Sequence, residues 1–319
     1  MNGFYLDGVI ERVTDGDTLR IMVDGTLFKV RVLGLDTEES NPNDAKPVTP
    51  WGRAATAFAT SILPVDTPVT IEFAGTAPAL VRDAQGDTII NPNYLDNHDR
   101  PLGYVHLSQP VDGITDFSEL MIRKGYSPYF VKYGRSIFAD YDARYAVAEQ
   151  AAQRDHIGVW NQFAVNGVMN ANTAPRNYAQ LMVWWELRAR LIDDFRAARA
   201  VAPPGTLLNT RIDYTTLVEK AMVGETATVF MELTQGETRG IHYTIKTGSR
   251  SQPLQVFLPN ADDPKIRAVL NLLRARYVAD GEDFPRRNYA YVQGPLKMFK
   301  GRPEIVVTEA SQISDTPPV

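Results

Sequence analysis

The chain has 319 residues, of which 44% are hydrophobic and 22% are charged, a composition typical of a globular protein with room for two domains. No apolar run approaches the roughly 20 residues that span a bilayer, so the sequence predicts no membrane-spanning helix and no membrane partner. The absence of cysteine excludes disulfides and thiolate metal sites, and the four histidines (His98, His106, His156 and His242) show no ligand spacing.

The formal net charge of −5 is unevenly distributed along the chain. Residues 1–165 contain 14 Lys+Arg and 22 Asp+Glu, a balance of −8, whereas residues 166–319 contain 19 and 16, a balance of +3. Binding of nucleic acid by such a chain requires local basic patches or a metal ion.

The N-terminal sequence gives a conditional prediction of localisation. It enters a strand-like pattern without a basic n-region or an apolar h-region. If Met1 is the native start, we expect a cytoplasmic protein; if a signal peptide was removed, we expect a secreted one.

The first half of the chain has the pattern of a small β-barrel covered by helices. Apolar residues alternate through the first 35 positions, and Asp24-Gly25 is a strong hairpin signal. Thr49 and Pro50 begin a predicted helix over 49–63 as its cap and first residue. Further strands are predicted at 68–73 and 101–107, and further helices at 116–125 and about 136–155.

The second half predicts a long helix followed by another barrel. Residues 176–200 form an amphipathic pattern that ends at "VAPPGT". Strands are then predicted at 227–233, 241–247 and 254–258, a helix at 263–278, and two closing strands at 289–296 and 304–310. Five strands with a helix before the last two indicate an oligonucleotide-binding (OB) barrel. The predicted class is therefore β-rich α+β, with domains at 1–165 and 205–313 and a linking helix over 166–204.

The stretch "RVTDGDTLRIMVDGTLFKVRVLGLDTEES", residues 12–40, combines carboxylates and an arginine at predicted strand ends. Asp17 and Asp36 are suited to share a hard cation such as calcium, which takes 6 to 8 oxygen ligands. Glu39 is placed to orient or deprotonate a water, and Arg31 offers a bidentate fork for a phosphate. Arg100 supplies a second arginine. A positioned water, a metal and cations near the phosphorus oxygens are the requirements for phosphodiester hydrolysis.

The strand pattern sets a geometric condition on this site. A strict two-residue turn at Asp24-Gly25 would place Asp17 opposite Val32 and Thr18 opposite Arg31. Because successive side chains alternate faces, Asp17 and Arg31 would then point to opposite sides. The proposed site therefore requires a longer turn or a bulge between them, and a strict register without one would mean that the proposed site is wrong.

Several ordered motifs resemble the thermonuclease (staphylococcal nuclease-like) family. They are "DGDT", "VRVLGLDTEE", "GRAATAFA", "DRPLGYV", "LMIRKGYS" and "GVW", over about residues 8–162, roughly half the chain. The resemblance implies an OB barrel with three helices and hydrolysis of DNA and RNA to products that bear 3′-phosphates.

The same resemblance implies roles for individual residues. Asp17 and Asp36 would bind calcium together with the backbone carbonyl of Thr37, while Asp15 would support these ligands without touching the metal. Glu39 would serve the water, and Arg31 and Arg100 the phosphate. Glu38 stands where the family usually has proline. Two tyrosines and a lysine past the second helix are candidates for stacking a base and contacting phosphate: Tyr129, Lys132 and Tyr133.

The segment "GPLKMFKGRPEIVV" resembles the closing hairpin of nucleic-acid-binding OB folds. Lys297, Lys300 and Arg302 beside Phe299 fit a loop that follows a nucleic acid backbone with one stacking ring. A solvated basic turn, or a barrel that binds a protein and localises the enzyme, is the alternative.

These features predict a calcium-dependent nuclease that acts on DNA or RNA, with single-stranded or frayed substrate held by the C-terminal domain. The alternative is a nucleic-acid-binding or scaffold protein that has lost catalysis. A silent relative would be expected to lack at least one of Arg31, Arg100 and Glu39, and this chain has all three.

Overall fold

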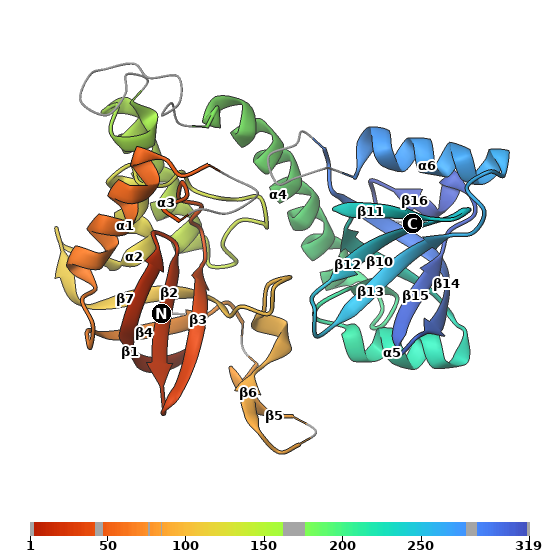
Figure 1. The fold of residues 1–319 in the computed structure, drawn as a ribbon, viewed down its shortest axis with the longest axis horizontal. Coiled ribbons are helices and arrows are strands. Elements are labelled where there is room, and N and C mark those ends of the chain that lie inside the picture. Colours follow the sequence, from red (N-terminus) through yellow and green to blue (C-terminus); the bar gives the residue numbers. More distant parts are fainter. Residues whose placement is uncertain are drawn as a thin grey trace. The chain divides into compact units, whose positions relative to one another are not determined.

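The computed structural model describes residues 3–41, 47–75, 77–83, 85–161, 176–278 and 286–317, and it divides into two compact units. The N-terminal unit comprises Met1–Asp96, Arg100–Val131 and Arg135–Gln180. The C-terminal unit comprises Asn97–Asp99, Lys132–Gly134 and Leu181–Val319. Figure 1 colours the chain from red at the N-terminus to blue at the C-terminus. None of the described helices is long and apolar enough to cross a membrane. The finer division at 1–165, 166–204 and 205–313 stays a prediction.

The N-terminal unit interleaves strands and helices. Its strands are β1 (Phe4–Asp15), β2 (Thr18–Val23), β3 (Thr26–Val32), β4 (Pro68–Phe73), β5 (Leu80–Arg82), β6 (Thr88–Ile90), β7 (Leu102–Val111) and β8 (Ile114–Asp116). Its helices are α1 (Pro50–Ile62), α2 (Phe117–Arg123) and α3 (Ala139–Arg154), with short 3-10 turns at Pro92–Tyr94 and Gly158–Trp160. Figure 1 shows α1, α2 and α3 gathered beside the strands.

Five strands of this unit close into a ring. Their order is β3-β2-β1-β4-β7, and β3 also pairs with β7 in parallel, with Arg31 opposite Leu102 and Val32 opposite Gly103. Apolar side chains that alternate along these strands fill the interior, among them Ile10, Leu19, Ile21, Val30 and Val32. The β-rich α+β class and an N-terminal five-stranded ring with three helices are thus as the sequence predicts.

The hairpin between β2 and β3 has the strict register. Thr18 pairs with Arg31 and Val23 with Thr26, and the two turn residues Asp24 and Gly25 have φ of 48° and 79°. Positive φ at both positions is the geometry that Asp-Gly favours in a two-residue turn. The prediction that the site needs a longer turn or a bulge here is therefore wrong. Asp17 is a turn residue before β2, outside the regular pleat, so face alternation does not fix its side chain.

The C-terminal unit also alternates helices and strands. Its helices are α4 (Tyr178–Val201, which begins in the N-terminal unit), α5 (Tyr214–Val223) and α6 (Pro264–Arg276). Its strands are β9 (Leu207–Asn209), β10 (Thr226–Glu232), β11 (Gln235–Arg239), β12 (His242–Gly248), β13 (Pro253–Leu258), β14 (Tyr289–Phe299), β15 (Arg302–Val306) and β16 (Ile313–Ser314), with a 3-10 turn at Ala310–Gln312.

The strands of the C-terminal unit form one sheet in the order β11-β12-β13-β15-β14-β10-β9, with β16 beside β14. The pair β13–β15 is parallel, as is β10–β9, and the other pairs are antiparallel. Buried apolar residues of α5, α6 and the sheet form its main core, including Leu217, Val269 and Val292. That this sheet is a second OB barrel stays a prediction.

Glu149 on α3 gives the N-terminal unit a pH-dependent stability. Its Oε1 accepts a hydrogen bond of 2.8 Å from the backbone N–H of Tyr129. Burial raises the pKa of the Glu149 carboxyl from 4.5 to about 7, which the bond to Tyr129 partly opposes. Because the folded state prefers the protonated form, the stability from Glu149 is fully present below pH 4.5 and is lost as pH rises through about 7.

Glu149→Gln is therefore expected to stabilise the protein at pH 8, by up to about 3 kcal/mol, and to leave stability unchanged near pH 4.5. Glutamine keeps the acceptor for Tyr129 without the ionisation. Urea unfolding at both pH values measures the difference, with the exposed Glu219→Gln as control. An equal effect at both pH values would show that burial of the charge is not its cause.

Candidate active site

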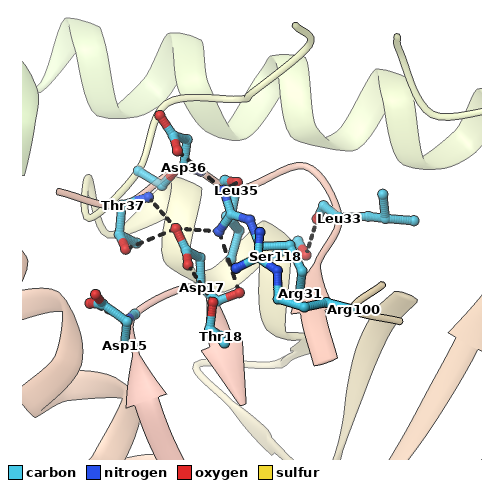
Figure 2. Close-up of polar contacts among 12 residues, drawn as sticks. Asp15, Asp17, Thr18, Arg31, Leu33, Leu35, Asp36, Thr37, Arg100 and Ser118 are labelled. Carbon is cyan, nitrogen blue, oxygen red and sulfur yellow. Dashed lines mark hydrogen bonds and ion pairs between the residues drawn. The ribbon is translucent and has the colours of Figure 1, made fainter. Parts of the chain in front are cut away.

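The predicted site residues of the opening stretch meet at one end of the strand ring. Asp17 lies in the turn before β2, Arg31 lies near the end of β3, and Asp36 follows in the next loop. Asp17 and Asp36 are 8% and 3% exposed. Figure 2 shows their side chains around the Arg31 guanidinium. We call Asp17, Arg31 and Asp36 the central triad.

Arg31 joins the two carboxylates of the central triad. Its Nη1 forms an ion pair with Asp17 Oδ2, and its Nη2 lies 3.1 Å from Asp36 Oδ1 and 2.9 Å from the carbonyl oxygen of Leu35. Nη1 is also 3.4 Å from the carbonyl oxygen of Asp17. The guanidinium fork thus holds both carboxylates at once, which a lysine could not do with the same geometry.

Hydrogen bonds from neighbouring groups orient the Asp17 carboxylate and fix the backbone of Asp36. Asp17 Oδ2 accepts from the backbone N–H of Thr37 at 2.9 Å and from its hydroxyl at 3.2 Å, and Oδ1 accepts from the Thr18 hydroxyl at 3.0 Å (Figure 2). The backbone N–H of Asp36 donates to Ser127 Oγ at 2.9 Å. Thr37 therefore ties the loop after β3 to the turn before β2.

Asp15 holds the same region from the outside. Its Oδ1 accepts from the Thr56 hydroxyl on α1 and from the backbone N–H of Gly16, both at 2.9 Å, and its Oδ2 lies 3.5 Å from the backbone N of Ser40. Asp15 thus links β1, α1 and the end of the loop that carries Asp36. That Asp15 supports the metal ligands, as the sequence resemblance implies, stays a prediction.

The backbone of Glu39 is fixed by the segment that leads into α1. Glu39 forms a parallel bridge with Val48, and its carbonyl oxygen accepts from the backbone N–H of Thr49 at 3.1 Å. Thr49 caps α1 by accepting from the backbone N–H of Gly52 at 3.0 Å. A Cβ added at Gly52 would lie 2.1 Å from the Glu39 carbonyl oxygen. Glycine at position 52 therefore allows α1 to approach the backbone that carries Glu39.

Arg100 lies just before β7, whose first residues pair with Arg31 and Val32. Its Nε is 2.7 Å from Asp96 Oδ2, and its backbone N–H donates to Asp96 Oδ1 at 2.8 Å. The backbone N–H of Arg31 donates to the carbonyl oxygen of Pro101 at 2.8 Å, so the chain next to Arg100 adjoins the central triad. Figure 2 draws Arg100 with no dashed contact to the other side chains shown.

Sequence reasoning missed a second group of residues at the central triad. Arg176 Nη1 lies 2.5 Å from Asp36 Oδ2, although the two residues are 140 positions apart. Glu38 is 3% exposed, and its Oε1 accepts from the backbone N–H of Arg176 at 3.0 Å and from the Tyr178 hydroxyl at 2.7 Å. The unusual Glu38 was the one signal in the sequence, because a buried carboxylate requires a partner.

The tyrosines predicted to contact substrate differ in their surroundings. Tyr129 is 7% exposed; its hydroxyl donates to Asp142 Oδ1 at 2.8 Å and accepts from the backbone N–H of Ser136 at 2.9 Å. Burial raises the pKa of its phenol. Tyr133 is 47% exposed, and Lys132 Nζ lies 5.0 Å from its ring centroid. Tyr129 is thus built into the core, and contact of these three residues with substrate stays a prediction.

The basic residues of the C-terminal unit surround a tight hairpin between β14 and β15. Phe299 pairs with Arg302, and the turn residues Lys300 and Gly301 have φ of 48° and 79°. Lys300 Nζ lies 5.4 Å from the centroid of the exposed Phe299 ring. Lys297 Nζ lies 3.0 Å from the buried Glu304 carboxylate. A cation, a ring and two further basic residues therefore share one hairpin, and contact of this hairpin with nucleic acid stays a prediction.

The side chains at the central triad fit a hard divalent cation in their chemistry. Within the described ranges, no three His, Cys, Asp or Glu side chains form a metal-binding group, so backbone carbonyls and water would complete the oxygen ligands around Asp17 and Asp36. Counted with its supports, the site has four carboxylates and two guanidiniums, namely Asp15, Asp17, Asp36, Glu38, Arg31 and Arg176. This excess of negative charge suits a divalent cation. One carboxylate oxygen of the site, Asp36 Oδ2, is bound to Arg176.

Comparison with known proteins finds relatives for the part of the chain that carries Arg31 and Asp36. A model of the family of staphylococcal nuclease homologues matches residues 29–162. The chain is 28% identical over 155 residues to a thermonuclease of Staphylococcus intermedius, covering 48% of this chain and 76% of that protein. It is also 28% identical over 169 residues to an uncharacterized protein of Methanocaldococcus jannaschii, covering 48% of this chain and 71% of that protein. Residues 29–162 are therefore similar to the family of staphylococcal nuclease homologues.

Proposed function

We propose that this protein is a calcium-dependent nuclease that hydrolyses phosphodiester bonds of DNA or RNA. The observation that carries the proposal is the convergence of Asp17 and Asp36 on the Arg31 guanidinium, in a domain of the staphylococcal nuclease family. The thermonuclease similarity supports the same chemistry, because that protein is named for nuclease activity.

Two arginines are assigned to the phosphate. Arg31 lies near the end of β3, and Arg100 lies just before the neighbouring β7. A phosphodiester carries one negative charge, and more charge gathers on its oxygens as water attacks. Both guanidiniums are held in place, Arg31 by Asp17 and Asp36 and Arg100 by Asp96, and their positive charges near the phosphate stabilise the charge that develops.

Asp17, Asp36 and the carbonyl of Thr37 would hold calcium. When bound, calcium supplies positive charge that polarises the phosphate and lowers the pKa of water. Glu39 accepts the proton of the attacking water, and its backbone is fixed for that task by Val48 and Thr49. Asp15 keeps the turn before β2 against α1 through Thr56.

The C-terminal unit is assigned to holding substrate. The exposed Phe299 ring offers a surface on which a base can stack, and Lys297, Lys300 and Arg302 lie on the same hairpin. Stacking on a ring requires an unpaired base, so we propose that single-stranded or frayed DNA or RNA is preferred.

The direct test is hydrolysis of fluorescent single-stranded and duplex DNA by the wild-type protein with calcium, with magnesium, or with excess chelator. Calcium-dependent cleavage that Asp36→Asn abolishes is the expected result. Binding without cleavage under every metal condition would contradict the proposal and would identify a nucleic-acid-binding protein instead. Oligonucleotides of DNA and RNA with the same sequence would then measure the preference between the two sugars.

A further inference from the structure

Arg176 occupies the side of Asp36 that faces away from Arg31. Asp36 Oδ1 binds Arg31 Nη2 at 3.1 Å, and Asp36 Oδ2 binds Arg176 Nη1 at 2.5 Å. The Arg176 side chain is 15% exposed and that of Asp36 is 4% exposed. Screening by solvent is weak at such a site, so the ion pair is stronger than one on the surface.

The position of Arg176 is set by contacts with Glu38. The Glu38 carboxylate accepts from the backbone N–H of Arg176 and from the Tyr178 hydroxyl, at 3.0 and 2.7 Å. The ring of Tyr178 lies 5.7 Å from that of Trp160, measured between centroids. Burial raises the pKa of the Tyr178 phenol, which keeps its hydroxyl a donor to Glu38. The segment 176–178 is therefore bound to the loop that carries Asp36 at both of its ends, through Arg176 and Tyr178.

We propose that Arg176 is a built-in competitor for the divalent cation at Asp36, docked there by Glu38 and Tyr178. The inference rests on the proposed metal site at Asp17 and Asp36. A carboxylate oxygen that accepts a guanidinium at 2.5 Å cannot at the same time take a metal in the same direction. A metal that binds Asp36 Oδ2 along that direction thus requires Arg176 to leave, and we infer that the metal affinity of the site depends on how firmly segment 176–178 is docked.

The effect of Arg176 on the metal dissociation constant depends on the fraction of molecules in which Arg176 has left Asp36. If Arg176 occupies Asp36 in 90 to 99% of molecules, the apparent dissociation constant for the metal rises by about 10- to 100-fold over its intrinsic value. Removal of the guanidinium is therefore expected to tighten metal binding, even though it also removes a contact from the folded protein.

Isothermal titration of the full-length chain with calcium chloride alone, without substrate, tests the proposal. Arg176→Gln is expected to lower the dissociation constant at least about tenfold. Tyr178→Phe, which removes only the hydroxyl that binds Glu38, should lower it by a smaller factor. The control is Arg190→Gln on α4, whose exposed side chain pairs with Glu186 one turn earlier at 3.2 Å, and this variant should bind calcium as the wild type does.

The possible failures are distinguishable. Equal affinity in the wild type and Arg176→Gln, with binding lost in Asp36→Asn, would overturn the role of Arg176 and leave the proposed metal site intact. Weaker binding in Arg176→Gln would also overturn it, because Arg176 would then support the metal. No calcium binding by any variant would overturn the proposed function as well. Circular dichroism of each variant confirms that it is folded.

Discussion

Replacing Glu39 with glutamine is expected to lower kcat for calcium-dependent hydrolysis by about 10²- to 10⁴-fold, the usual contribution of a general base. The substitution keeps the size of the side chain and removes its capacity to accept a proton. The backbone at this position is held by Val48 and Thr49, so the loop should keep its place. Binding of substrate should therefore change little. Single-turnover cleavage of a fluorescent oligonucleotide gives the rate, and fluorescence anisotropy gives the affinity.

The control for Glu39→Gln is Glu11→Gln on β1. It removes a carboxylate from the same unit that has no role in the proposed reaction. Glu11 Oε2 pairs with Arg20 Nε at 2.7 Å, and its side chain is 40% exposed. Its loss should leave kcat unchanged. If Glu39→Gln hydrolyses DNA as fast as Glu11→Gln does, Glu39 is not the base. If neither the wild type nor either variant cleaves DNA, the protein is a nucleic-acid-binding or scaffold protein without nuclease activity.

The sequence predicted local structure well where a few neighbouring residues determine it. Thr49 caps α1 through its side chain, with proline at the first turn, and Asp24-Gly25 forms the two-residue hairpin. These features depend on residues within about four positions of one another. The pattern did not reveal α5, whose preceding Asp213 makes no side-chain cap hydrogen bond.

The register argument failed because it treated Asp17 as a strand residue. The pairing of Thr18 with Arg31 is the strict one, and Asp17 still reaches Arg31. Alternation of faces holds for a regular pleat, but Asp17 lies in the turn before β2, and the long Arg31 side chain extends past the strand end. Alternation therefore predicts the face of a side chain inside a strand. It does not predict the direction of a side chain at the strand end, where active sites are commonly built.

No local sequence pattern predicted the contact of Arg176 with Asp36. Its contact with Asp36 joins residues 140 positions apart, and no periodicity or cap connects them. The sequence did contain the departure at Glu38, which the structure shows to be buried and bonded to residues 176 and 178. Glu38, at the position where the resemblance leads one to expect proline, is thus the residue that marked this contact in the sequence.

Replacing Arg31 with glutamine is expected to destabilise the protein by about 3 to 5 kcal/mol in the absence of calcium. The Arg31 side chain is 13% exposed and neutralises Asp17 and Asp36, which are themselves buried. Glutamine leaves both carboxylates without that charge in a poorly solvated place. Urea unfolding in excess chelator measures the loss.

Calcium should restore more stability to Arg31→Gln than it adds to the wild type, because the ion can supply the positive charge that the variant lacks. A ligand at 100 times its dissociation constant stabilises the folded state by about 2.7 kcal/mol. The control is Arg20→Gln on β2, whose exposed pair with Glu11 should contribute at most about 1 kcal/mol and show no added calcium response. If the two arginine variants lose equal stability in chelator, the carboxylates of the central triad do not depend on Arg31. A loss that calcium fails to offset would instead show that these carboxylates bind Arg31 and not the metal.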